Sequence, residues 1–382
     1  MQRKTGTYEI TAVAGERVRA FIPAPLPPQR PVLQNEKFAQ PLAATQEAIA
    51  RLNTVSALTP SVDWLIYASV RKEALLTSQI EGTQASLTDL FDAESAIEVG
   101  NPDDVEEVSN YLKAVKFVRK NLLSAKGLPV SSRLLCEAHK LLLSGTRGRN
   151  KQPGLIRTSQ NWIGGTRPGN AVHVPPPAQH VQGLMGALEK YIHDGPATLA
   201  PLLRIGLIHV QFETIHPFLD GNGRIGRLLV TTLLEDWRII EQPLIYPSGY
   251  FKMHQSEYYR RLNAVRSDGD WEGWLAFFLE GLTQSARDAE RLVLDTAKLV
   301  LSHRKKLLAL DRVSPTALKL FELLPSMPRL TVERVRKTLK TTFPTANAAV
   351  ATLVRAGLLT ERTGRRKYRS FSYESYVKLL SR

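Results

Sequence analysis

The sequence predicts a mainly α-helical protein with small β additions, and three observations predict it. Most of the 382 residues lie in segments whose apolar side chains recur every three to four positions, the period of a helix with one buried face. Residues 154–177 are rich in glycine, proline and turn-forming residues, as in a β-hairpin. From about residue 313, short helical segments are followed by two β-prone pieces.

The composition is that of a globular protein with a buried core. Hydrophobic residues make up 43% and charged residues 23% of the chain. No stretch approaches the apolar length of a membrane span, and no apolar signal core follows the basic residues 1–4, so we expect a cytoplasmic protein without membrane contact. Cys136 is the only cysteine, which excludes an internal disulfide and a thiol-based zinc site. The net charge of +15 favours acidic partners such as a nucleotide, a nucleic acid or an acidic protein.

The N-terminal third is expected to begin with an extended arm and to continue as helices. Residues 22–32 are proline-rich, and proline fixes φ and donates no hydrogen bond. Amphipathic patterns then predict helices, with one break at residues 58–60, over residues 43–90, 105–123 and 131–143.

Residues 154–177 predict a β-hairpin or flap between helices. A Gly-Gly pair and a Pro-Gly-Asn turn would reverse the chain, Val172-His173-Val174 is β-prone, and three prolines end the segment. After it, helices are expected over residues 181–192, 199–215, 225–237, 255–266 and 271–300.

The C-terminal part is short-helical and basic. Residues 331–382 hold twelve Lys or Arg and three Asp or Glu. A helix near residues 316–324, a helix–turn–helix over 332–341 and 345–356, and two β-prone pieces around residues 364–367 are expected. That order resembles a winged helix, which serves in DNA contact or in protein contact.

The segment 216–227, HPFLDGNGRIGR, joins two predicted helices. Pro217 should end the first helix near Ile215. Gly221 and Gly223 allow backbone angles that a side chain would forbid. Several N–H groups would then converge at the start of the next helix, which makes an anion site suited to phosphate.

Four side chains in this segment carry suitable chemistry. Arg224 and Arg227 are three residues apart on a helix, so both can face the anion site. Asp220 offers a hard oxygen ligand for Mg²⁺ beside bound phosphates, and His216 can act as a base near neutral pH. A phosphate cradle, a metal, cations and a base are what phosphoryl or nucleotidyl transfer needs.

HPFLDGNGRIGR also matches, at every fixed position, the pattern His-x-Phe-x-(Asp/Glu)-Gly-Asn-Gly-Arg-x-x-Arg of the Fic family. Residues 77–82, TSQIEG, are similar to the family's inhibitory motif, (Ser/Thr)-x-x-x-Glu-(Gly/Asn). The segment 157–177 sits where the family keeps a target-docking flap, and residues 246–248 and 258–259 resemble its later nucleotide-pocket region. The chain resembles Fic proteins over nearly its whole length, most strongly in residues 60–290.

The resemblance implies a protein adenylyltransferase, which moves AMP from ATP onto a Ser, Thr or Tyr hydroxyl of a target protein or of itself. It implies that His216 takes the proton from the hydroxyl, that Asp220 binds Mg²⁺ and that Arg227 contacts the terminal phosphates. The remaining nucleotide contacts that it implies are Gly221, Asn222, Gly223, Arg224, Tyr259 and Leu262.

The resemblance also implies an inhibitory element and a docking edge. The inhibitory residues would be Thr77, Glu81 and Gly82, with the Glu81 carboxylate paired to Arg227. Glu81 could instead orient a water that removes AMP from the target. In the flap, the turn and the edge that pairs with a target strand would be formed by Gly165, Gly169, Asn170, Val172 and Val174.

Four parts are expected along the chain. They are an N-terminal arm and helical region with the inhibitory motif at 1–110, a Fic catalytic core at 111–290, a linker helix at 291–312 and a winged-helix domain at 313–382. The alternative function is a DNA-binding regulator whose Fic core senses nucleotide, with DNA bound by residues 313–382. A homodimer is also left open.

Two other interpretations of the motif region are disfavoured by its surroundings. Residues 221–226, GNGRIG, satisfy the dinucleotide fingerprint G-x-G-x-x-G, but a helix precedes them where that fingerprint needs a strand. His209, Glu213 and His216 could suggest a metal cluster, but the spacing crosses the helix end, so His209 is expected to be an ordinary hydrogen-bonded helical histidine.

Overall fold

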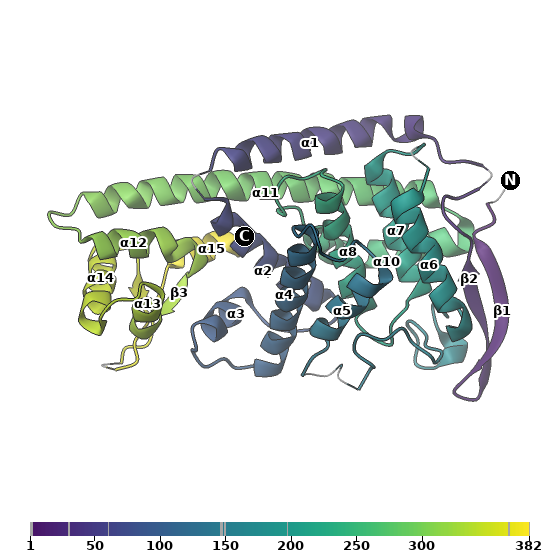
Figure 1. Cartoon of the computed structure of the whole chain (residues 1–382), viewed down its shortest axis with the longest axis horizontal. Helices are drawn as coiled ribbons and strands as arrows, with labels where there is room; N and C mark the ends of the chain where they lie inside the picture. The colour runs from purple at the N-terminus through teal and green to yellow at the C-terminus, as the bar shows by residue number, and fades with distance from the viewer. Residues whose placement is uncertain are drawn as a thin grey trace.

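Two buried helices, α7 (Pro201–Ile215) and α8 (Asn222–Asp236), form the centre of the molecule (Figure 1). The computed structural model describes residues 3–29, 31–59, 61–145, 148, 150–196, 198–365 and 367–381. Every residue of α7 except Pro201 and Arg204 is buried, because apolar side chains occur on every side of this helix. α8 packs against it, and only three of its residues are not buried.

The surrounding helices confirm the predicted mainly helical class. They are α1 (Ala39–Ala57), α2 (Val62–Ile80), α3 (Leu87–Glu94), α4 (Pro102–Leu122), α5 (Ser132–Leu142), α6 (Ala178–Asp194), α9 (Ser248–Met253), α10 (Gln255–Asp268) and α11 (Trp271–Leu308), with a 3₁₀ turn η1 (Asn35–Phe38) before α1. The Asn101 and Ser131 side chains cap α4 and α5 by accepting a hydrogen bond from a first-turn N–H group. Within the described ranges, no helix is both long and apolar enough to span a bilayer.

The N-terminal segment forms a hairpin that the sequence analysis did not predict. Strands β1 (Gly6–Val13) and β2 (Glu16–Pro23) pair antiparallel from Gly6 opposite Pro23 to Val13 opposite Glu16. Residues 14 and 15 turn the chain with φ values of 48° and 84°, a geometry that favours Asn-Gly over the Ala-Gly found here. The extended arm expected at residues 22–32 therefore begins as the end of β2.

The segment predicted as a β-hairpin or flap is a loop closed by an antiparallel bridge. Ile163 and His173 form the bridge, and a 3₁₀ turn, η2 (Pro168–Asn170), lies between them in the sequence. The Asn170 side chain accepts hydrogen bonds from the Thr166 and Arg167 N–H groups, which stabilises the turn. The prolines in and after this segment have no N–H to extend the ladder.

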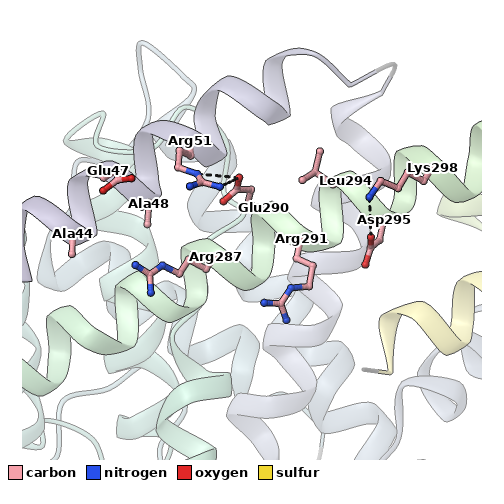
Figure 2. A pocket seen from close by; sticks show the side chains of 10 residues that line it. All are labelled: Ala44, Glu47, Ala48, Arg51, Arg287, Glu290, Arg291, Leu294, Asp295 and Lys298. Atoms are coloured by element: carbon pink, nitrogen blue, oxygen red, sulfur yellow. Dashed lines mark hydrogen bonds and ion pairs between the residues drawn. The ribbon is translucent and has the colours of Figure 1, made fainter.

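Helix α11 is longer than predicted and continues through the linker expected at residues 291–312 (Figure 1). It runs from the core to the C-terminal elements, and α1 packs along it. A cavity of about 340 Å³ lies between the two helices (Figure 2). Arg51 of α1 pairs with Glu290 of α11 there, at 2.9 Å. No residue of the 216–227 segment lines this cavity.

The C-terminal elements follow the predicted order of short helices and β pieces. They are α12 (Pro315–Leu323), η3 (Leu324–Ser326), β3 (Arg329–Thr331), α13 (Val332–Thr338), α14 (Phe343–Arg355), β4 (Thr360–Glu361), β5 (Ser370–Ser372) and α15 (Glu374–Leu380). The three strands form an antiparallel sheet in the order β3-β5-β4. Of the basic residues expected between the last two strands, Arg366 lies outside the described residues.

These C-terminal elements are packed on the helical core. Ser95, directly after α3, donates a hydrogen bond to the Arg329 carbonyl at 2.6 Å. The Arg329 guanidinium lies 3.4 Å from the Asp92 carboxylate. On the other side, His303 of α11 contacts the Tyr373 hydroxyl at 2.8 Å. The module is therefore held against both α3 and α11.

Candidate active site at the junction of helices α7 and α8

The loop between α7 and α8 has the sharp geometry that its sequence predicts. α7 ends at Ile215, and His216 takes left-handed angles with φ 50° and ψ 63°. Gly221 precedes α8 with φ 75°, and a Cβ there would lie 3.1 Å from the Leu142 side chain. The backbone thus turns twice within six residues and starts α8 at Asn222.

Asn222 shapes this loop through its side chain. Its amide oxygen accepts a hydrogen bond from the Phe218 N–H, and its amide nitrogen donates to the Phe218 carbonyl, both at 2.8 Å. Because the side chain is buried and both of its polar atoms are engaged in these bonds, it stabilises the turn. The predicted phosphate contact of Asn222 would therefore fall to its main chain at the start of α8.

His139 of α5 holds the loop from outside, and the sequence analysis missed it. The Gly154 N–H donates to its Nδ1 at 2.9 Å, so Nε2 carries the ring proton and donates to the Asp220 carbonyl at 3.0 Å. The ring stacks on Phe218 with centroids 3.9 Å apart. Burial lowers the pKa of His139 to about 4, so the ring is neutral. The sequence feature that could have indicated this role is a histidine on the apolar face of the helix predicted over residues 131–143.

Arg157 is a second residue that the sequence analysis missed. It is buried, and its guanidinium donates to the carbonyls of His216 at 2.9 Å and Pro176 at 2.6 Å. The last carbonyls of a helix carry partial negative charge, which suits a cation at the end of α7. Burial lowers the pKa of Arg157 to about 10, still well above neutral pH. No sequence signal separates this arginine from the others, because its partners are main-chain atoms.

His216 is neutral in this environment. Burial lowers the pKa of its imidazole to about 3, and the positive charge of Arg157 lowers it further. A neutral imidazole has a free lone pair, so His216 is in the protonation state that a general base requires.

Asp220 and Arg224 lie next to each other at the start of α8. The Asp220 side chain is 45% exposed, and one of its oxygens accepts from the Gly221 N–H at 2.6 Å. The Arg224 guanidinium lies 3.6 Å from that oxygen and is paired on its other side with Glu107 of α4. Glu107 was also missed, although an acid on the buried face of a helix calls for a charged partner.

Arg227, Thr77 and Glu81 meet, the contact expected from the similarity of residues 77–82 to the family's motif. The Arg227 guanidinium donates to the Thr77 hydroxyl at 2.7 Å, to the Thr77 carbonyl at 3.1 Å and to the Glu81 carboxylate at 2.6 Å. Burial alone would lower the pKa of Arg227, but Glu81 outweighs it and the pKa lies above its ordinary value. Burial would likewise raise the pKa of Glu81, but Arg227 keeps it below its usual range. Both groups are therefore charged at neutral pH.

Gly223 gives the Glu81 carboxylate room at the start of α8. A Cβ at this position would lie 2.4 Å from the Glu81 Oε1 atom and 2.9 Å from the Arg227 guanidinium. A side chain at 223 would therefore displace one of the two. Gly82, directly after Glu81, has φ 102°, an angle that lets the chain leave α2 abruptly.

The remaining predicted residues are spread over different surroundings. Tyr259 is 43% exposed, and the Glu81 and Arg227 charges reach its phenol. Leu262, one helical turn away, is buried in the apolar core. His209 is buried, with its two ring nitrogens in contact with the Gly226 carbonyl and the Tyr258 hydroxyl, as expected for an ordinary helical histidine.

The flap residues are partly covered by the hairpin. Val172 is 65% exposed, but Val174 is buried and its carbonyl accepts a hydrogen bond from the Phe21 N–H of β2 at 2.9 Å. Gly165 turns with φ 73°, and the Gly169 N–H donates to the Glu16 carboxylate at 3.1 Å. On the predicted edge over residues 170–174, Val172 is therefore exposed with its N–H bonded to the Ile163 carbonyl, and the Val174 carbonyl is bonded to β2.

A magnesium ion bridging to nucleotide phosphates fits Asp220. Over the described ranges, no three His, Cys, Asp or Glu side chains cluster to hold a metal by themselves. The Asp220 carboxylate is half-open to solvent beside the first turn of α8. Mg²⁺ is commonly held by one or two carboxylates with phosphates and water completing its shell, which one accessible aspartate can provide.

Known proteins share both the sequence and the fold of this region. The family description "Fic/DOC family N-terminal" matches residues 39–119, and "Fic/DOC family" matches residues 129–234. The protein adenylyltransferase Fic of Drosophila melanogaster is 28% identical over 205 residues, which are 53% of this chain and 38% of that protein. The protein of the same name in Drosophila ananassae is 28% identical over 208 residues, with the same two shares. The matched region is thus well under half of these relatives' length.

Solved structures agree on the fold. A Fic family protein from Desulfovibrio desulfuricans aligns with a TM-score of 0.57 and 23% identity, covering 90% of this chain and 98% of that one. Fic-1 from C. elegans aligns with a TM-score of 0.52 and 20% identity, covering 68% of this chain and 73% of that one. Residues 39–119 therefore form a Fic N-terminal domain and residues 129–234 form a Fic domain, the two domains of the Fic/DOC family.

Proposed function

We propose that this protein transfers AMP from ATP to a Ser, Thr or Tyr hydroxyl of a protein and that Glu81 inhibits the transfer. The observation that carries the proposal is the α7–α8 loop, where a neutral His216, a half-open Asp220 carboxylate and the Arg227 guanidinium surround the start of α8. The names of the Drosophila relatives support the same activity.

In the proposed reaction, the target oxygen forms a bond to the α-phosphorus of ATP. The bond from that phosphorus to the oxygen that bridges to the β-phosphate breaks, and pyrophosphate leaves. The hydroxyl proton passes to the His216 imidazole, whose neutral form can accept it. The N–H groups of the first turn of α8 and the Arg224 and Arg227 guanidiniums would bind the phosphates. Asp220 would hold Mg²⁺, whose charge offsets the negative charge of the phosphates.

Inhibition would follow from competition for Arg227. The Glu81 carboxylate occupies the guanidinium that would receive the terminal phosphates, and its charge repels them. ATP bound beside Glu81 would have its α-phosphate out of line for attack, and a misplacement of about 1 Å can cost about 10²-fold in rate. The same carboxylate could orient a water, so AMP removal stays a second direction of the same proposal.

The target would dock at the flap. An extended segment that pairs with main-chain groups is held whatever its sequence, so its register would position the hydroxyl. The Val172 N–H bonds the Ile163 carbonyl and the Val174 carbonyl bonds β2, so the docked segment would pair with other main-chain groups beside the exposed Val172.

The C-terminal module supports a second function. We propose that the described residues from 313 to 381 form a winged helix that contacts DNA, with α14 as the recognition helix and Gly364, Arg365 and Lys367 in the wing. The order of helices and strands and the excess of twelve basic over three acidic residues in 331–382 support it. Protein contact by the same module is the alternative, and salt-dependent DNA binding separates the two.

The test of the transferase proposal uses two labels. The protein, with Mg²⁺ and host lysate, is incubated with ATP labelled either on the α-phosphate or on the γ-phosphate. We expect label on protein from the α position only, together with a mass increase of one AMP. Label from the γ position would mean phosphorylation, and no label with wild type and Glu81→Gly would contradict the proposal.

A further inference from the structure

Both arginines of the α7–α8 motif pair with a carboxylate from another helix. Arg227 pairs with Glu81, and Arg224 pairs with Glu107. Both pairs join an arginine to a glutamate, so the residue types alone do not distinguish their roles. Their surroundings differ: one glutamate can move away from its arginine, and the other is fixed in the core.

Glu81 can leave its arginine. It closes α2 as the residue after the helix, and its side chain is 32% exposed. Gly82 follows it with φ 102° and no heavy atom within 4 Å of its Cβ position. A side chain at a helix end, beside a glycine in open space, can move out without disturbing a packed core.

Glu107 cannot leave its arginine in the same way. It lies inside α4, its side chain is 12% exposed, and that of Arg224 is 5% exposed. The adjacent Val108 and Tyr111, one turn further along α4, are buried in the core. α4 packs against α2, α5 and α8. Withdrawing Glu107 would require α4 to shift, so the pair is part of the folded core.

The pair also sets what Arg224 does to Asp220. One terminal nitrogen of Arg224 bonds Glu107, and the other lies 3.6 Å from the Asp220 carboxylate. Without Glu107, the buried Arg224 guanidinium would turn toward the Asp220 carboxylate, because its charge would otherwise lose its partner. Glu107 holds the guanidinium back and leaves the Asp220 carboxylate accessible.

We propose that Glu107 is a positioning residue that holds the Arg224 guanidinium for phosphate binding, the opposite of the role of Glu81. The inference rests on the proposed nucleotidyl transfer. Glu107 acts through Arg224 and touches neither the nucleotide nor the target. Removing Glu81 should therefore raise transfer, and removing Glu107 should lower it.

The test compares Glu107→Gln and Glu107→Ala in the Glu81→Gly chain, with Glu106→Gln as the matched control. Glu106 is the exposed neighbour on the same helix. The affinities of each variant for ATP and for adenosine are measured by calorimetry. The KM for ATP and the kcat of AMP transfer are measured on the same variants. Losing an oriented, charge-assisted contact to phosphate should weaken ATP binding about 10- to 100-fold. Adenosine, which has no phosphate, should bind as before. Gln, which keeps the shape and one hydrogen bond, should lose less than Ala.

Two results would overturn the proposal. Equal weakening of ATP and adenosine binding would mean that Glu107 only supports the fold. Increased transfer by Glu107→Gln in the otherwise unchanged chain would mean that Glu107 is a second inhibitor. If Glu107→Ala fails to fold, Glu107→Gln and Glu107→Asp give the same comparison, checked by thermal unfolding. If the Glu81→Gly parent transfers no AMP, the proposed function fails. The comparison of ATP binding with adenosine binding still tests whether Glu107 positions Arg224.

Discussion

The Glu81 carboxylate lies 2.6 Å from the Arg227 guanidinium, where one partner closes a helix at the surface and the other is buried at the centre of the molecule. The contact joins residues that are 146 positions apart. An ion pair of this kind can be broken from its exposed side without unfolding its buried side. That asymmetry underlies the first prediction.

Glu81→Gly should increase AMP transfer and self-modification by about 10²-fold or more, because it frees Arg227 and removes the charge that misaligns the α-phosphate. Adding Arg227→Ala to this variant should abolish the gain, since the phosphates then lose their cation. The measurement is incorporation of α-labelled ATP per mole of protein. Unchanged incorporation in Glu81→Gly would rule out inhibition by this residue. Retention of AMP on a premodified target that wild type strips would assign Glu81 to AMP removal instead.

His216→Ala should lower transfer by about 10²- to 10⁴-fold while ATP binding and thermal unfolding stay near those of the parent, because only the proton acceptor is lost. The pH profile gives a second check. Since the pKa of His216 is lowered to about 3, the base stays unprotonated well below the ordinary histidine range. The kcat of the Glu81→Gly variant should therefore not fall between pH 8 and pH 6 through protonation of His216. A kcat that falls with a midpoint near 6.5 would contradict this environment for the base.

The motif residues could be predicted from the sequence because they are neighbours in it. His216, Asp220 and Arg227 lie within twelve positions, and their spacing on a loop and one helix already brings them together. The residues that the sequence analysis missed act over long separations. Arg157 binds main-chain carbonyls, and Glu107 meets Arg224 across 117 positions. Pairings of this kind depend on the tertiary fold, and one sequence without its relatives does not indicate them.

Pairing between distant segments also explains why the β1–β2 hairpin and the detailed shape of the flap were not predicted. The β1–β2 hairpin has an Ala14-Gly15 turn in place of the usual Asn-Gly signal, and Ala14 takes φ 48° only because the paired strands hold it there. The flap was expected to be a hairpin from its turn residues. The Val174 carbonyl of the flap bonds the Phe21 N–H of β2, so the flap pairs with the β1–β2 hairpin as well as with itself.

Acid should destabilise the fold through His139. Its folded pKa of about 4 lies below the ordinary value of 6.5, so between these values the unfolded chain binds a proton that the folded chain does not. The contribution of His139 to the free energy of unfolding is therefore at its maximum above pH 6.5. It decreases as the pH drops toward 4, by up to about 3 kcal/mol. Chemical denaturation at several pH values measures this slope.

His139→Phe separates the two contributions of that ring. Phenylalanine keeps the stacking surface on Phe218 but leaves the Gly154 N–H and the Asp220 carbonyl without their partner. We expect a loss of about 1–3 kcal/mol at pH 7 and a shallower loss on acidification, because the titrating group is gone. An acid slope as steep as in wild type would assign the pH dependence to His209 or to other groups.

Val172→Pro should block modification of the target and spare ATP binding. The Val172 N–H donates to the Ile163 carbonyl at 2.9 Å, so proline breaks this bond within the flap, fixes φ and distorts the edge on which a target strand would pair. Val172→Thr, which keeps that bond, is the matched control. Self-modification and target modification are measured with ATP binding. Equal loss of nucleotide binding and target modification would place docking elsewhere.

The full-length protein should bind duplex DNA with an affinity that falls steeply as salt rises, because each neutralised phosphate releases a counterion. The C-terminal module is packed on α3 and α11, so the intact chain presents it in its native setting. Arg365 and Lys367 are exposed at the tip between β4 and β5. Replacing both with alanine should reduce the slope of log affinity against log salt by about two, one for each cation. Lys190→Ala, which removes an exposed cation on α6, should leave that slope unchanged, and all three chains should transfer AMP equally. An equal slope for the double variant and wild type would exclude the tip from DNA contact. No binding at low salt would leave the module to protein contact.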